Sequence, residues 1–383
     1  MLKNDNIRYL DKQVTDRLNV NDLSGSCIST ESSLHQIAPY IGKIKSTIAV
    51  KLIEHYTRPG SVILDPFAGS GTIPLEALIL KRHAIANDLN PYAISLIKAK
   101  MFPEPSEDFA KAKVRKYIQS SKKMGNSFNV CDIPDWVKKF YHPLTLKEIV
   151  IFNKLLIEND EFFLHGCFLG ILHHQRPGFL SYPASHLVPY LRTKLYPLEK
   201  YPHLYEYRDL ESRINRKIER SFRRFTMHDK KLQRIVLQKN ACKLKFKNDF
   251  IDAIITSPPY MNTLSYARDN RLRLWFLGYN NYKKMDKMSP NNINEFKQLM
   301  KSFLINIYDS LKINSVCVFI LGDINRTSKC LNTAIALNEV VDDLGDFKID
   351  EIIKNDLPIK RRTRKNCSRT KSEWIIVFRK CKS

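Results

Sequence analysis

The sequence predicts an α/β fold in which one mostly parallel sheet is interrupted by a mostly helical insertion. Short apolar runs that alternate with helical patterns occur at 61–88, and this alternation returns from residue 250. Between them, at 104–235, the strand pattern fades, and helical periods and proline-rich loops replace it. The chain has 383 residues. Because an ordinary domain has about 150 residues, this length allows one large sheet domain that carries an inserted domain.

The composition indicates a folded protein with a strong positive field. Lysine and arginine total 63 against 39 acidic residues, a formal net charge of +24, while 43% of the residues are hydrophobic. Disordered chains combine high charge with low hydrophobicity, so this composition argues against disorder. A positive field favours polyanionic partners, nucleic acid ahead of an anionic membrane. A generally basic, lysine-rich proteome would give the same charge without such a partner.

The cysteines and the apolar runs indicate an ordinary cytoplasmic protein. Eight cysteines are too few for a disulfide scaffold and include no C-x-x-C pair, so we expect no zinc or other metal site. The first residues, MLKNDNIRYLDKQVTD, lack the apolar stretch of a signal peptide. The most apolar run, 162–172, is too short to span a membrane and contains His165. We therefore expect a reduced, cytoplasmic location and no membrane partner.

The individual elements follow from periodicity and from turn residues. Apolar side chains at a 3.6-residue period predict helices, and short apolar runs bounded by Gly, Pro, Asn or Asp predict strands. The first half is expected to contain a helix at 44–56, a strand at 61–64, a helix at 73–81 and a strand at 83–86. Helices are expected at 146–157, 162–172, 211–225 and 296–311, and strands at 250–255, 315–321, 347–353 and 373–378. The first of these groups is a βαβ unit, which predicts parallel strands.

These elements predict three regions. We assign residues 1–34 to a polar N-terminal arm, 35–103 and 236–383 to one discontinuous sheet domain, and 104–235 to an inserted helical domain.

The strongest local signal is the octapeptide DPFAGSGT at 65–72, which follows a predicted strand and precedes a predicted helix. Its two glycines allow a sharp turn and a close approach to a ligand, and the helix N-terminus offers free N–H groups. It is not a P-loop, because GxxxxGK[ST] is absent. The next strand ends at Asp88, where a carboxylate is placed to accept hydrogen bonds from ribose hydroxyls. The turn and this acid predict an adenosine-containing cofactor.

A second signal is TSPPY at 256–260, directly after the predicted strand FIDAII. Two prolines cannot continue a central strand, since neither can donate to the ladder. The chain must leave the sheet here. It presents Ser257, the Pro258 carbonyl and Tyr260 at the edge where open α/β sheets bind ligands.

Together these segments resemble the amino-group DNA methyltransferases, which use S-adenosylmethionine to methylate N4 of cytosine or N6 of adenine. DPFAGSGT matches the family's cofactor motif and TSPPY its catalytic motif, while HQIAPYIGK at 35–43 resembles its N-terminal cofactor motif. TLSYARDNRLRLWFLGY at 263–279 resembles the segment that follows the catalytic motif. The resemblance covers about 35–95 and 235–379. It implies a Rossmann-like class I methyltransferase sheet and S-adenosylmethionine as the cofactor.

The resemblance also implies the site residues. For cofactor binding they are Tyr40, Lys43, Asp65, Phe67, Gly69, Gly71, Thr72, Asp88 and Asn240. For catalysis they are Ser257, Pro258, Pro259 and Tyr260. The chain departs from the family at Lys239-Asn240-Ala241, where members commonly carry Gly-Asp-Ala, although the Asn240 amide oxygen can still accept a hydrogen bond.

The catalytic motif suits methylation of an exocyclic amine. Such an amine is a poor nucleophile because its lone pair is delocalised into the ring. Acceptors such as Ser257 Oγ and the Pro258 carbonyl favour a pyramidal nitrogen, and Tyr260 can stack on the base. In-line transfer then depends on orientation and electrostatics. The resemblance implies base flipping, because the target atom is inaccessible in a stacked duplex. The chain has no Pro-Cys pair, which argues against C5 methylation of cytosine.

Two basic segments are candidates for contact with DNA phosphates. The segment 211–225 combines an apolar stripe with a basic face, and 360–371 is a basic run between the last two predicted strands. A solvated surface helix and a disordered loop are the alternatives. The candidate residues are Arg213, Arg216, Lys217, Arg220, Arg223, Arg224, Lys360, Arg361, Arg362 and Arg364. The insertion is the expected target-recognition region. Its aromatic residues and histidines that could face bases are Tyr141, His142, His173, His174, Tyr182, His186 and Tyr190.

These observations predict a site-specific methyltransferase that acts on duplex DNA. Serine at 257 favours cytosine N4, because members with serine there mostly modify cytosine and members with aspartate mostly modify adenine. A prokaryotic restriction-modification system, with a cognate endonuclease as partner and a nucleoid-associated location, is the expected setting. Adenine N6 methylation, methylation of an RNA base, and a non-catalytic DNA-binding subunit are the alternatives. The sequence leaves the oligomeric state open.

Overall fold

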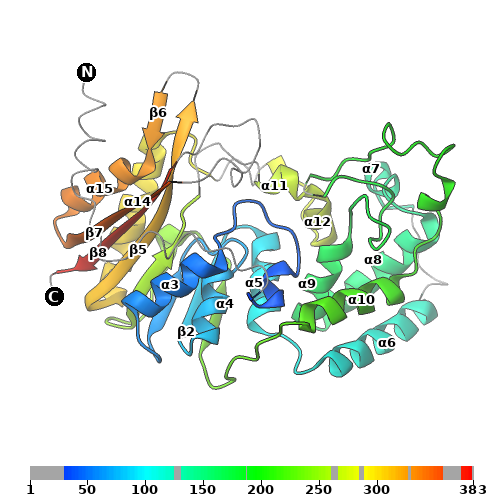
Figure 1. The fold of residues 1–383 in the computed structure, drawn as a ribbon, viewed down its shortest axis with the longest axis horizontal. Helices are drawn as coiled ribbons and strands as arrows, with labels where there is room; N and C mark the ends of the chain where they lie inside the picture. The colour runs from blue at the N-terminus through cyan, green and yellow to red at the C-terminus, as the bar shows by residue number, and fades with distance from the viewer. Residues whose placement is uncertain are drawn as a thin grey trace.

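The chain folds into a twisted sheet with a helical unit beside it (Figure 1). The computed structural model describes residues 30–124, 131–186, 188–259, 266–283, 289–326, 329–356 and 372–381. The strands are β1 (Val62–Asp65), β2 (His83–Asn87), β3 (Arg234–Leu237), β4 (Ile251–Thr256), β5 (Leu311–Arg326), β6 (Lys329–Asn332), β7 (Phe347–Asp356) and β8 (Ser372–Lys380).

The strand order in the sheet is β3-β2-β1-β4-β5-β8-β7. Strands β1 to β5 pair in parallel, and β8 lies antiparallel between β5 and β7. The sequence order reverses between β1 and β4, which is the switch point at which open α/β sheets bind ligands. The predicted Rossmann-like α/β fold is confirmed. The short β6 pairs with the end of β5 and forms a hairpin that extends past the sheet (Figure 1).

Helices cover both faces of the sheet. On one face lie α3 (Ser46–Tyr56), α4 (Thr72–Ile79) and α5 (Pro91–Met101), and on the other lie α14 (Ile293–Ile307) and α15 (Thr333–Leu344). Side chains of a strand alternate between its two faces. Accordingly, Val316 and Val318 of β5 pack with the first group of helices, while Cys317 and Phe319 pack with the second. The strands are therefore buried on both sides, which explains their continuous apolar runs.

The helical unit lies between α5 and β3 in the sequence. Its elements are α6 (Glu107–Met124), α7 (Asp135–Lys138), α8 (Pro143–Glu158), α9 (Phe162–Ile171) and α10 (Leu210–Phe222). The chain after the catalytic motif adds α11 (Tyr266–Asp269) and α12 (Arg271–Phe276). Short 3₁₀ turns complete the fold: η1 (Ser33–Gln36), η3 (Pro202–Leu204), η4 (Ala241–Lys243) and η5 (Tyr308–Ser310).

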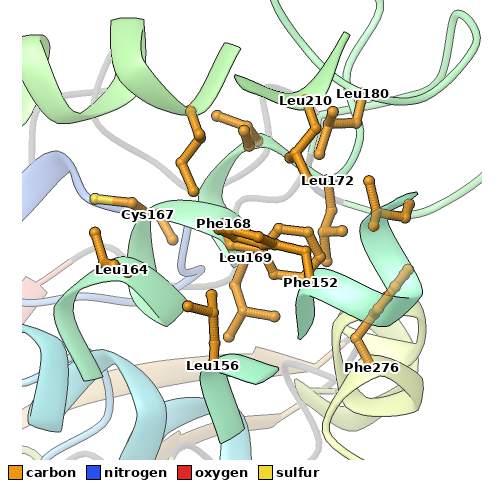
Figure 2. Close-up of a cluster of buried hydrophobic side chains, with 14 of the residues drawn as sticks. Phe152, Leu156, Leu164, Cys167, Phe168, Leu169, Leu172, Leu180, Leu210 and Phe276 are labelled. Carbon is orange, nitrogen blue, oxygen red and sulfur yellow. The ribbon is translucent and has the colours of Figure 1, made fainter. Parts of the chain in front are cut away.

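The helical unit and the segment after the catalytic motif share one hydrophobic core. Figure 2 shows Phe152 of α8, Phe168 of α9 and Phe276 of α12 packed together. The Phe168 and Phe276 rings are 5.5 Å apart, nearly perpendicular. Helix α9 is buried from Phe163 to Ile171, as expected for a helix that is largely apolar on every side. The insertion is therefore packed directly against residues that follow the catalytic motif.

The boundaries differ from the predicted ones at a few places. The helix predicted at 296–311 ends at Ile307, and β5 begins at Leu311 instead of at 315, because Leu311 already pairs with Ile251. Strand β3 was not predicted. It is a half-buried edge strand whose apolar run, Ile235 to Leu237, has only three residues, and it begins at Arg234, before the predicted start of the second sheet segment. Helices α5, α6 and α15 were not predicted either. Among the described residues, no helix has both the length and the apolar character to cross a membrane.

Candidate functional site

A cavity of about 360 Å³ lies at the carboxyl ends of β1, β2 and β4, next to the reversal of strand order. Both motifs and the N-terminal segment line it. The predicted residues in its wall are Tyr40, Lys43, Asp65, Phe67, Gly69, Thr72, Asp88, Asn240, Ser257, Pro258 and Pro259. This volume is in the range of small-ligand sites. Three segments far apart in the sequence therefore meet at one pocket. Tyr260 lies outside the described residues.

The glycine turn of DPFAGSGT needs its glycines. Gly69 and Gly71 have φ values of +49° and +76°, in the left-handed region that favours glycine. A Cβ at Gly71 would lie only 3.0 Å from Ile97 Cγ1 and 3.2 Å from Ile97 Cα, on helix α5. Gly69 lies against the Tyr40 ring, 3.5 Å from where its own Cβ would be. The turn is therefore packed between α5 and the N-terminal segment, as close approach at this edge requires.

The two motifs are joined by a buried hydrogen bond. Thr256 Oγ1, at the end of β4, donates to Asp65 Oδ1 at 2.7 Å, and the Phe67 N–H donates to the same oxygen at 3.3 Å. Parallel pairing of β1 with β4, Leu64 opposite Ile254, brings these residues to one level. The bond fixes the start of the catalytic loop relative to the glycine turn.

Burial raises the pKa of Asp65 to about 7, although the hydrogen bond from Thr256 works in the opposite direction. A carboxyl group whose pKa is higher in the folded than in the unfolded chain makes the fold less stable as pH rises between those two values. Asn at this position cannot ionise, and its amide oxygen can keep the bond to Thr256. Relative to the wild type, Asp65→Asn should therefore gain stability between pH 5 and pH 8, by at most about 3 kcal/mol, because this interval covers the upper part of the range between the two pKa values. Urea unfolding at the two pH values measures this, and equal differences at both would contradict it.

Asp88, directly after β2, holds the glycine turn in place. Its Oδ2 accepts from the Gly69 N–H and its Oδ1 from the Asn90 N–H, both at 2.8 Å. Burial raises the pKa of Asp88, while these backbone donors favour the charged form. Because the side chain remains partly exposed and lines the cavity, its free lone pairs can accept from a ligand hydroxyl. This agrees with the predicted contact with ribose.

Asn87 is a positioning residue that the sequence did not single out. Its Nδ2 donates to the Pro66 and Lys239 carbonyls, each at 3.0 Å, and its Oδ1 accepts from the Lys239 N–H at 3.0 Å. One amide thus joins the glycine turn to the end of β3. The sequence signal that could have identified Asn87 is its position at the end of a buried strand, at the edge of the sheet where ligands bind.

A network of buried ionisable groups lies behind the glycine turn. Lys100 of α5, 1% exposed, donates to the Ser70 carbonyl at 2.5 Å. Glu76 of α4 is hydrogen bonded to His35 Nε2 at 2.5 Å, and Lys43 Nζ donates to the His35 carbonyl at 3.1 Å. Burial lowers the pKa of Lys100 and raises the pKa of Glu76, each to about 7. The network therefore connects the N-terminal segment, which contains His35 and Lys43, to the glycine turn.

The residues at hand fit S-adenosylmethionine. Asn90 Nδ2 is buried, lines the same cavity and has no hydrogen-bond partner among the described residues, so a donor is left for a ligand oxygen. Acidic and aromatic residues, Asp88, Phe67 and Tyr40, also line this cavity. The Tyr40 ring stacks on Tyr92 at 5.9 Å, and the Tyr92 hydroxyl donates to the Pro39 carbonyl at 2.6 Å. The predicted N-terminal cofactor segment is held by these contacts.

Asn240 is placed in the pocket wall, but its amide oxygen is already used. Asn240 Oδ1 accepts from the Cys242 N–H at 3.0 Å and caps η4. The prediction that this oxygen replaces the family's aspartate as an acceptor for the adenine region therefore meets a competing local bond. The amide oxygen has a second lone pair, so its contact with a ligand stays a prediction.

The basic segment 211–225 folds as α10, but its cations do not form one continuous exposed face. Lys217 is buried, 8% exposed, and its Nζ donates to the Gln36 carbonyl at 2.7 Å. The expectation that it contacts phosphate is wrong for this reason. Arg213 donates to the Phe179 and Asp209 carbonyls, and Arg224 to the Glu31 carbonyl. The exposed cations of the segment are Arg216, Arg220 and Arg223. The other basic run, with Lys360, Arg361, Arg362 and Arg364, lies outside the described residues.

Three of the residues proposed to face bases are buried, among them His174, which is 8% exposed. Tyr141 and His173 are 2% and 0% exposed, while Tyr190 is 49% exposed. Within the described ranges, no three His, Cys, Asp or Glu side chains are grouped so that they could hold a metal ion.

Comparison with known proteins gives one family match. Residues 24–99 match the family model described as DNA methylase. No curated protein sequence matches the chain. Among solved structures, TrmN from Thermus thermophilus is 12% identical, with 91% of this chain and 52% of that chain covered and a TM-score of 0.35. A SAM-dependent methyltransferase from Methanosarcina mazei is also 12% identical, with coverages of 87% and 98% and a TM-score of 0.35.

A second Thermus thermophilus protein, assigned to the DNA modification methylases and solved in complex with S-adenosyl-L-methionine, is 16% identical over 38% of this chain and 54% of that chain, with a TM-score of 0.23. The chain spans about half the length of this protein and of TrmN. At these identities and TM-scores, the solved structures carry no argument about the activity of this chain. The family match is confined to residues 24–99.

Proposed function

We propose that this chain is an S-adenosylmethionine-dependent methyltransferase of the amino-group DNA methyltransferase family, whose model its residues 24–99 match, and that it methylates the exocyclic N4 of cytosine in duplex DNA. The observation that carries the proposal is the shared cavity, which is lined both by the glycine turn and by Ser257 to Pro259. The buried bond between Asp65 and Thr256 holds these two segments together. A bound cofactor and a base at the catalytic loop would therefore meet in one place.

S-adenosylmethionine supplies an activated methyl group on a sulfonium centre. The chain's own task is to orient the attacking amine. Ser257 Oγ and the Pro258 carbonyl are proposed to accept its two N–H bonds, which directs the nitrogen lone pair towards the methyl group. No strong base is needed before attack, because the amine is neutral and loses its proton after the bond forms. The two prolines restrict the loop, so these acceptors are positioned before the substrate arrives.

The target base must leave the duplex to reach this loop, and we propose that it is flipped. Serine at 257 is the residue that favours cytosine over adenine. The exposed arginines of α10, Arg216, Arg220 and Arg223, are proposed phosphate contacts, and a restriction-modification system with a cognate endonuclease is the proposed setting. The charge of +24 supports a polyanionic substrate.

Expression in a bacterial host that lacks DNA methyltransferases tests the base and the site together. We expect N4-methylcytosine within one short sequence context of the host genome, as read by modification-sensitive sequencing. N6-methyladenine in one context would instead support the adenine alternative. A genome without either modification, at normal levels of folded protein, would contradict the proposed function.

A further inference from the structure

A second group of cations borders the cavity on the side of the helical unit. Ala267 of α11 lines the cavity, and Arg268 follows it with a side chain that is 51% exposed. In the next helix, α12, the Arg271 guanidinium is half-buried. These residues therefore continue the surface of the molecule outward from the pocket.

Arg271 joins three segments at this surface. Its Nη2 donates to the Pro189 carbonyl at 2.5 Å, and its guanidinium lies 5.9 Å from the centre of the Trp136 ring of α7. The structure thus brings α12, α7 and the loop before α10 together, as the upper right of Figure 1 shows. None of these contacts is between neighbours in the sequence, so the surface is a product of the fold.

Backbone hydrogen bonds hold the loop that precedes α10 at this surface. Ala184 forms an antiparallel bridge with Leu191, the Ser185 N–H donates to the Tyr190 carbonyl and the Arg192 N–H to the Pro183 carbonyl, both at 2.9 Å. A further bond, from the Tyr182 N–H to the Phe140 carbonyl at 2.7 Å, attaches the loop to the helical unit. The loop presents Tyr190 to solvent, and Trp136, which Arg271 links to the same loop, is 38% exposed.

Cations outnumber acids on this surface, although α7 begins with Asp135, whose side chain is 88% exposed. The sequence of 183–195 contains Arg192 and Lys194 and no acidic residue, and 266–279 contains a single acid, Asp269. Asp269 is 1% exposed, and its Oδ1 lies 3.4 Å from the guanidinium nitrogens of Arg268, so it offsets part of the charge of that arginine from below the surface. Exposed aromatic rings among arginines and lysines are the combination that binds nucleic acid, with cations on phosphates and rings on bases or sugars.

We infer that duplex DNA docks on this surface, formed by Trp136, Tyr190, Arg192, Lys194, Arg268 and Arg271, next to the base that enters the cavity. The inference rests on the proposed function and adds where the duplex lies. Arg268 and Lys194 contact phosphates, and Trp136 and Tyr190 contact the strand close to the target. Arg271 is a positioning residue, because its guanidinium holds the loop to α12. In Figure 1 these elements lie on the side of the β5–β6 hairpin, where β4 and β5 end, whereas α6 lies at the opposite side of the helical unit.

Substitution of the exposed residues tests the inference, with duplex DNA from a plasmid that the wild-type protein methylates as the probe. The double variant Trp136→Ala/Tyr190→Ala should bind it at least about tenfold more weakly, since a stacked ring contributes about 1–3 kcal/mol. Arg268→Ala should weaken binding and lower the salt slope of log affinity by about one. Calorimetry should show unchanged affinity for S-adenosylmethionine in all of these variants.

Matched controls separate this surface from general charge and exposed apolar area. Phe109 of α6 is 48% exposed, and the exposed Arg58 precedes β1, at the amino ends of the strands and away from the cavity. Phe109→Ala and Arg58→Ala should therefore bind DNA as the wild type does. Wild-type DNA affinity and methylation in the double variant and in Arg268→Ala would overturn the inference and leave the proposed function intact. Loss of cofactor binding or of folding in those variants would also overturn it, because the role would then be structural. A wild-type protein that neither binds nor methylates DNA would refute the proposed function itself.

Discussion

Ser257→Ala should lower kcat for methyl transfer at least about a hundredfold, the loss typical of removing one preorganised hydrogen-bonding group at a reacting centre. Ser257 lines the cavity beyond the end of β4, and its hydroxyl is the acceptor proposed to hold one amine N–H. The interaction strengthens as the nitrogen becomes pyramidal, so its loss should appear in kcat more than in KM. Affinity for S-adenosylmethionine should not change, because no cofactor contact is assigned to this hydroxyl.

Ser120→Ala is a matched control for this substitution. Ser120 lies on α6, and its hydroxyl donates to the Lys116 carbonyl within the same helix. Turnover of this control should equal that of the wild type. Equal turnover by Ser257→Ala would remove Ser257 from the catalytic group, whereas a parallel loss of cofactor binding would place it in the cofactor site instead.

Asp88→Ala should weaken binding of S-adenosylmethionine about ten- to hundredfold, the range expected when hydrogen bonds to a charged group are lost. Two effects combine. The proposed acceptor for the ribose hydroxyls disappears, and the Gly69 and Asn90 N–H groups lose the oxygens that hold the turn in shape. Calorimetric titration of the purified variant measures the change directly.

Asp88→Asn and Asp229→Ala complete this experiment. The Asn variant keeps a side-chain oxygen for one of the two N–H groups and should bind with intermediate affinity. Asp229 also accepts a backbone N–H two residues on, from Lys231 at 2.9 Å, but it is exposed in the loop before β3. Asp229→Ala should leave affinity unchanged. If Asp88→Ala also kept full affinity, the turn would not be the cofactor site.

Most of the fold and the main outline of the pocket could be predicted from short stretches of the sequence. Strands buried on both faces appear in the sequence as apolar runs, and the residues just after β1 and β4 were predicted to share an edge because parallel strands end together. The glycine turn was predicted for the reason that the structure shows, a backbone with positive φ at Gly69 and Gly71. These features depend on short stretches of chain and on the geometry of a sheet.

Features that depend on distant partners were missed. Lys217 reads as one more cation on a basic helix, and only the fold brings its ammonium group to a carbonyl 181 residues away. Lys100 and Asn87 act on the glycine turn from other elements, and no local pattern indicates this. Helix α5, by contrast, carried readable start signals in its Asn90 cap and in Pro91, which is suited to a first helical position.

The central claim is amino-group methylation of a DNA base, and the most direct measurement is methyl transfer by the purified protein. Plasmid DNA is incubated with isotopically labelled S-adenosylmethionine, digested to nucleosides and analysed by mass spectrometry, with Ser257→Ala in parallel. We expect labelled N4-methyldeoxycytidine from the wild type and at most traces from the variant. Label in 5-methyldeoxycytidine, or in no deoxynucleoside at all, would contradict the claim.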